Sequence, residues 1–166
     1  IFVDPKRTID KYDQIQGTVI LPNLTEWCHL VKQPDKRDYF YNGLDIDSVL
    51  HEMAFLSFRH MGNFKYHIIT CDRKGSVLIV PDIKSKNKYA IYHAPTAYNG
   101  KISLDSPLGA GDILTAVFAG NYDKSIEDND NSKAIKMVLN AFQEANKVAG
   151  AYCSMPWHQM PSKNNI

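Results

Sequence analysis

One helical pattern near the end of the chain most constrains its fold. From Ser132 onward, apolar residues recur with helical spacing and fall on a single face: Ile135, Val138, Leu139, Phe142, Ala145, Val148, Ala149 and Tyr152. Pro156 ends this pattern, because proline cannot continue a helix. A helix of this length with one apolar side needs another layer to cover it, and the rest of the chain has to supply that layer.

The rest of the chain alternates between short strand-like and helix-like segments. We expect strands at residues 1–3, 18–21, 66–70, 76–80 and 88–93, and helices at 25–32, at 47–61 and just after residue 112. Residues 9–15 could form a crossover that makes the first two strands parallel, whereas the turn at 72–75 would pair 76–80 back on 66–70. The pattern predicts an α/β layered fold with a mainly parallel sheet and a β-hairpin.

Composition and charge narrow the class of protein. The 166 residues are 44% hydrophobic and 22% charged, which suits one cored globular domain. A net charge of +1 offers no basic surface for nucleic acid, and no apolar run approaches the roughly 20 residues of a membrane span. Three scattered cysteines without C-x-x-C spacing indicate reduced, packed thiols. We therefore expect a cytoplasmic protein that binds neither nucleic acid nor membrane.

A glycine-rich turn carries the clearest chemistry. Ser106–Asp112 leads from a loop into a helix, and Gly109 and Gly111 on either side of Ala110 let the backbone turn tightly with its N–H groups exposed. Such amides at a helix start can stabilise the charge on a transferring phosphoryl group. Asp112, beside them, could accept the proton of an attacking hydroxyl. The alternative is that Asp112 is only a helix-capping acid.

Here the sequence resembles the ribokinase-like (PfkB) carbohydrate kinases. Their G-A-G-D turn opens a helix, as residues 109–112 would, and their P-N-x-x-E motif follows a strand, as Pro22–Glu26 does. The resemblance implies that Asp112 is the general base, that residues 109–111 form the anion hole, and that Asn23 and Glu26 help to order Mg²⁺ near the ATP phosphates, through water or phosphate. A bare N-cap role for Asn23 is the competing interpretation.

Two further elements follow the family's layout. A strand ends at Thr70 and a turn closes on Gly75, so by resemblance both would border the nucleotide phosphates, although the family's usual glycine is Asp72 here. A simple hairpin turn would explain the same residues. Asn146 stands where the family has an asparagine near the adenine pocket; a solvent-facing asparagine is the alternative.

Within the family, the chain is most similar to bacterial D-glycero-β-D-manno-heptose-7-phosphate kinases, through Val3–Lys6, Tyr12 and Pro22–Trp27. The resemblance covers only the nucleotide-binding half of a kinase. The sugar-binding half and its lid are absent, so we expect the chain to begin inside a larger fold and to be inactive alone. Ser106-Pro107 replaces the Asp-Thr of the loop that builds a monovalent cation site in many relatives, which leaves that cation doubtful.

The sequence thus predicts an ATP- and Mg²⁺-dependent kinase acting on a sugar or sugar phosphate, with the missing N-terminal half as a partner and a homodimer left open. A non-catalytic ribokinase-like module that binds nucleotide or protein is the main alternative. An unrelated α/β domain is a third. Walker P-loop and G-x-S-x-G motifs are absent, which removes those enzyme classes.

Overall fold

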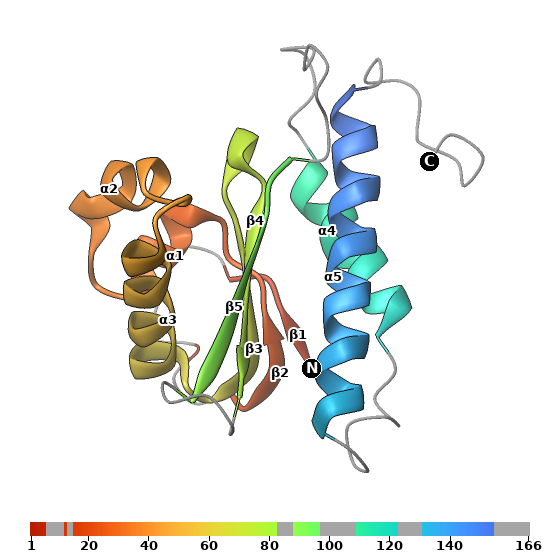
Figure 1. Cartoon of the computed structure of the whole chain (residues 1–166), viewed down its shortest axis with the longest axis horizontal. Coiled ribbons are helices and arrows are strands. Elements are labelled where there is room, and N and C mark those ends of the chain that lie inside the picture. Colours follow the sequence, from red (N-terminus) through yellow and green to blue (C-terminus); the bar gives the residue numbers. More distant parts are fainter. Residues whose placement is uncertain (6–11, 13–14, 83–87, 97–108, 123–130, 155–166) are drawn as a thin grey trace. The chain divides into compact units, whose positions relative to one another are not determined.

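The computed structural model describes residues 1–5, 12, 15–82, 88–96, 109–122 and 131–154. The chain divides into two compact units, Ile1–His93 and Ala94–Ile166. Among the described residues, the strands and the helices up to Met61 belong to the first unit, with the last strand ending at Ala94 on the boundary. The helices from Ala110 onward belong to the second unit (Figure 1). No helix within the described ranges is long and apolar enough to cross a membrane.

Five strands form one sheet in the order in which they occur along the chain. They are β1 (Phe2–Val3), β2 (Gly17–Ile20), β3 (Phe64–Thr70), β4 (Ser76–Pro81) and β5 (Tyr89–Ala94). Strands β1, β2 and β3 run parallel, with Val19 opposite both Phe2 and Tyr66, whereas β3 and β4 are antiparallel. The predicted mainly parallel sheet with a β-hairpin is confirmed. Most of the predicted crossover at residues 9–15 lies outside the described residues.

Helices α1 (Leu24–Leu30), α2 (Arg37–Asn42) and α3 (Asp47–Met61) connect β2 to β3 and lie on one face of the sheet (Figure 1). Their apolar side chains and part of those of the strands, among them Ile20, Ile69 and Ile79, form a buried core. Trp27 is wholly buried in it, edge-on to Phe40 with ring centres 4.9 Å apart, and its indole N–H donates to Ser57 Oγ at 2.9 Å. This core fixes the start of α1 against the sheet, which positions the site described below.

Two helices of the second unit pack along one another, α4 (Ala110–Asn121) and α5 (Asn131–Ser154). The predicted apolar face of α5 is confirmed, because Val138, Phe142 and Ala145 are fully or almost fully buried. On α4 the buried residues are Leu114 and Phe118, four residues apart and therefore on one face.

The sequence-based boundaries needed two corrections. The first helix was expected at residues 25–32 but ends at Leu30, because Lys32 has a left-handed backbone (φ 58°) that a helix cannot include. The second correction is α2, preceded by the 3-10 helix η2 (Pro34–Lys36), where no helix was expected. Six residues with only Phe40 buried are too few to show a helical period.

Candidate functional site

The predicted residues of the first unit meet at the carboxyl ends of two parallel strands. Asn23 follows β2 and forms an isolated parallel bridge with Thr70, the last residue of β3. The Thr70 N–H donates to the Pro22 carbonyl at 3.0 Å. In open α/β sheets, ligands bind outside the carboxyl ends of the strands. The topology therefore brings Asn23, Glu26 and Thr70 to the edge where a ligand site is expected.

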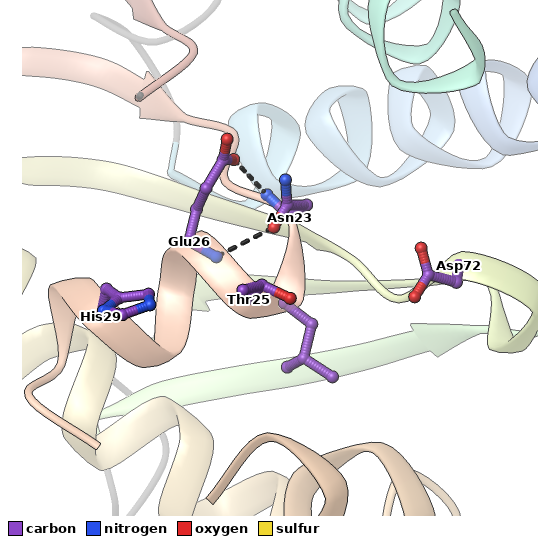
Figure 2. A pocket seen from close by; sticks show the side chains of 6 residues that line it. Asn23, Thr25, Glu26, His29 and Asp72 are labelled. Carbon is purple, nitrogen blue, oxygen red and sulfur yellow. Dashed lines mark hydrogen bonds between the residues drawn. The ribbon is translucent and has the colours of Figure 1, made fainter. Parts of the chain in front are cut away.

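Asn23 and Glu26 bond each other reciprocally at the start of α1. The Asn23 Oδ1 accepts from the Glu26 N–H, and the Glu26 Oε2 accepts from the Asn23 N–H, both at 2.9 Å (Figure 2). This capping box satisfies two backbone donors that the helix start leaves without partners. The structure thus shows the helix-capping role of Asn23. The second carboxylate oxygen of Glu26 makes no hydrogen bond to any described residue.

A pocket of about 560 Å³ opens beside this capping box. It is lined by Asn23, Leu24, Thr25, Glu26, His29 and Asp72 (Figure 2). Its volume lies within the range of small-molecule sites. Sequence reasoning missed His29, although its position three residues after Glu26 places both on one face of the helix.

The loop between β3 and β4 forms the other side of the site and contains the 3-10 helix η3 (Asp72–Lys74). The Cys71 N–H donates to the Gly75 carbonyl at 2.7 Å, so the loop closes as a hairpin. Gly75 has φ 90°, a backbone that favours glycine. The turn therefore explains the glycine at this position without a contact to phosphate. Asp72 also lies in the left-handed region, with φ 49°.

The glycine turn opens α4 in the second unit. Gly109 is the N-cap with φ 93°, a backbone that favours glycine, and a Cβ added there would make a tight contact of 3.3 Å with Tyr152 Oη. The first helical hydrogen bond runs from the Ile113 N–H to the Gly109 carbonyl at 2.9 Å. The N–H groups of residues 110–112 therefore have no acceptor within the helix.

Asp112 is exposed in the first turn of α4, and its carboxylate bonds no described residue. The N-cap of α4 is Gly109, and Asp112 is the acid of the first turn without a capping hydrogen bond of its own. Its role as a general base remains a prediction. At Gly111, in contrast, an added Cβ meets no described atom within 4 Å. The fold itself gives no reason for a glycine at that position.

Asn146 lies on α5, half-buried, and its Nδ2 donates to the Phe142 carbonyl at 2.7 Å. The side chain is partly exposed and bonds its own helix. The adenine contact and the solvent-facing asparagine both remain predictions. Ser106 and Pro107, in the expected cation loop, lie outside the described residues.

The ionisable groups of the described ranges supply no preformed metal centre. No cluster of three or more His, Cys, Asp or Glu side chains there could hold a metal ion. Burial raises the pKa of the Cys28 thiol to about 11 and that of Cys71 to about 12, so both stay protonated. Both are buried and free of disulfides, as the sequence predicted. Magnesium binding near Asn23 and Glu26 through water or phosphate remains a prediction.

Comparisons with known proteins define the fold. No protein-family model and no curated protein matches the chain. Among solved structures, the chain is similar to a ribokinase from Giardia lamblia, with a TM-score of 0.53 and 16% identity over 84% of this chain and 38% of that one. It is also similar to an Arabidopsis thaliana ribokinase complexed with ribose and ATP, with a TM-score of 0.47 and 18% identity over 99% of this chain and 43% of that one.

The fold of this chain is therefore ribokinase-like and belongs to the α/β class, as the sequence predicted. The chain spans about two fifths of the length of the ribokinases that it matches.

Proposed function

We propose that this chain is the nucleotide-binding half of an ATP-dependent carbohydrate kinase. The observation that carries the proposal is the opening of α4, where a left-handed Gly109 exposes three amides without helical acceptors beside the unbonded carboxylate of Asp112. An anion and a proton can be handled together at such a corner. The ribokinase-like fold and the polar pocket at the ends of β2 and β3 support the same conclusion.

In the proposed reaction, Asp112 accepts the proton of a sugar hydroxyl while that oxygen attacks the γ-phosphorus of ATP. The bond from the γ-phosphorus to its bridging oxygen breaks, and ADP leaves with the electron pair. The turn at residues 109–111 serves as the anion hole, and the amides of residues 110–112 that it leaves without helical acceptors stabilise the charge on the transferring phosphoryl group. A bound Mg²⁺ would neutralise phosphate charge, with Asn23 and Glu26 orienting its water or phosphate ligands. Thr70 and Gly75 would border the phosphates, and Asn146 the adenine.

For the substrate we propose a heptose 7-phosphate. The support is the sequence Pro22–Trp27 together with Val3–Lys6, which resembles the heptose-phosphate kinases. The groups that read the sugar would lie in a second half of the enzyme. Without those groups the base has no positioned hydroxyl, so the chain alone should bind nucleotide without transferring phosphate.

The proposal is tested by Asp112→Asn in the protein that also carries the sugar-binding half. We expect turnover to fall by roughly 10²- to 10⁴-fold, the usual contribution of a general base, with ATP affinity retained. Because Asp112 bonds no described residue, the substitution should leave the fold intact. Wild-type turnover in this variant would contradict the assignment.

A non-catalytic nucleotide-binding or protein-interaction module is the second candidate. It is favoured by Asp72, whose negative charge stands in the pocket wall where the family has a glycine. Calorimetry with ATP and Mg²⁺, followed by a turnover assay over a panel of sugars and sugar phosphates, separates the candidates. Binding without transfer by the complete protein would favour the module.

A further inference from the structure

Arg37, the first residue of α2, joins the two sides of the pocket. Its Nε donates to Thr25 Oγ1 at 3.2 Å, and its Nη2 lies 2.8 Å from Asp72 Oδ2. Thr25 stands in the first turn of α1 and Asp72 in the β3–β4 loop, and both line the pocket. Arg37 itself does not line it. One guanidinium outside the pocket lining thus bonds a residue on each of two walls of the pocket.

The guanidinium is held in this orientation by further contacts. Its Nη1 lies 3.1 Å from Asp38 Oδ1, and its central carbon lies 5.2 Å from the centre of the Tyr41 ring. Each nitrogen of the planar group therefore has an acceptor, and the group also lies against an aromatic ring. A lysine offers a single ammonium, which cannot reproduce this set of contacts.

Asp72 is the residue of the loop that most needs such a partner. Its left-handed backbone, φ 49°, costs a residue other than glycine conformational energy, although aspartate tolerates it better than most. The side chains of this ion pair are exposed to 36% for Arg37 and 63% for Asp72. Solvent therefore screens the attraction between their charges. The contact holds the Asp72 side chain at a fixed position relative to Arg37.

The opposite side of the loop has its own anchors. The Lys74 ammonium lies 5.0 Å from the centre of the Tyr41 ring, and His93 Nε2 lies 2.8 Å from the Lys74 carbonyl. The Lys74–Tyr41 contact shares its ring with Arg37, whereas the His93 contact does not involve Arg37. Loss of Arg37 should therefore loosen the loop at Asp72 without detaching it from the sheet.

We propose that Arg37 is a positioning residue that holds the Thr25 and Asp72 walls of the pocket in place before a ligand arrives. The assignment of Mg²⁺–ATP as that ligand rests on the proposed function, whereas the connection itself does not. Asp72 provides the contact on the loop side, through its carboxylate at 2.8 Å from Arg37 Nη2.

The test compares Arg37→Ala with Lys36→Ala in the purified protein. Lys36 is the preceding residue and forms a surface ion pair with Glu52 at 3.5 Å, away from the pocket lining, so it is a matched control. Hydrogen exchange of the loop amides, residues 71–75, reports on the connection without any ligand. We expect exchange there to accelerate about fivefold in Arg37→Ala and Arg37→Lys, and to stay unchanged in Lys36→Ala, since a partly exposed pair with one charged hydrogen bond contributes modestly.

A double-variant cycle then tests the coupling. Asp72→Asn keeps a residue that tolerates the left-handed backbone but removes the charge. In that background, Arg37→Ala should add little to loop exchange, and Mg²⁺–ATP affinity should fall about fivefold in the Arg37→Ala single variant. Unchanged loop exchange in Arg37→Ala, or additive effects in the double variant, would overturn the proposal, as would faster exchange with unchanged ATP affinity. If the wild type fails to bind Mg²⁺–ATP, the proposed function fails, and loop exchange still decides the role of Arg37.

Discussion

Gly111→Ala gives the sharpest test of the glycine turn, because the structure supplies no packing reason for a glycine there. A Cβ at residue 111 meets no described atom within 4 Å, and the residue lies in the first turn of a regular helix. Alanine favours a helix over glycine by up to about 1 kcal/mol. We therefore expect the variant to be as stable as the wild type or slightly more stable, with a melting temperature higher by about 0–4 °C.

Catalysis should respond in the opposite direction. If a phosphoryl group lies against the amides of residues 110–112, a methyl group on Gly111 stands where the ligand approaches. The N–H of residue 111 would remain, but the methyl group would hold the phosphoryl group away from it, and losing one such contact reduces turnover by about 10²–10³-fold, or about 3–4 kcal/mol of transition-state stabilisation. An unchanged fold with a large loss of activity is the signature of a glycine that is needed for the ligand.

The matched control is Gly120→Ala, the same substitution in the same helix, where an added Cβ again meets nothing within 4 Å. The assay follows ADP release with a panel of sugar phosphates, in the protein that carries both halves, alongside thermal unfolding of each variant. Gly120→Ala should keep wild-type turnover. Equal turnover of Gly111→Ala and wild type would refute the anion-hole argument.

Three predictions concern stability. Gly109→Ala should destabilise by roughly 1–2 kcal/mol in denaturant unfolding, because φ 93° disfavours alanine and its Cβ would press on Tyr152. Ser57→Ala should cost roughly 1–3 kcal/mol, since it leaves the buried Trp27 N–H without its acceptor; Ser57→Thr should cost less if the hydroxyl is what matters. Burial lowers the pKa of His67 from 6.5 to about 4, so the neutral form stabilises the fold above pH 6.5. As the pH falls from 6.5 to 4, the free energy of unfolding should decrease by about 3 kcal/mol, at about 1.4 kcal/mol per pH unit. In His67→Leu, urea unfolding should not show this contribution to the pH dependence.

Long local patterns predicted much of the fold. The expected helix at 47–61 matches α3 residue for residue, because its apolar positions repeat over four turns and Gly62 follows. Parallel strands also explain why Asn23 and Thr70 meet: residues at the carboxyl ends of neighbouring parallel strands share one edge. These features depend on spacing within a segment or on topology, and both can be inferred without coordinates.

The features that the sequence did not show depend on contacts between distant segments. Arg37 and Asp72 are 35 residues apart, and nothing local to either predicts their pairing. The left-handed backbone of Asp72 was also missed, although a turn between two strands is where aspartate adopts it. Likewise, the sequence did not show that Gly109 is the N-cap of α4 and that Asp112 makes no capping hydrogen bond.

The burial of Trp27 gives the protein an intrinsic optical reporter. Its indole follows Glu26 directly in α1, one residue from the pocket lining, and is enclosed by Phe40 and Ser57. The second tryptophan of the chain, Trp157, can be replaced by phenylalanine, so that emission comes from a single fluorophore. Its wavelength and quenching would then follow ligand titrations at the first turn of α1, with no label attached to the protein.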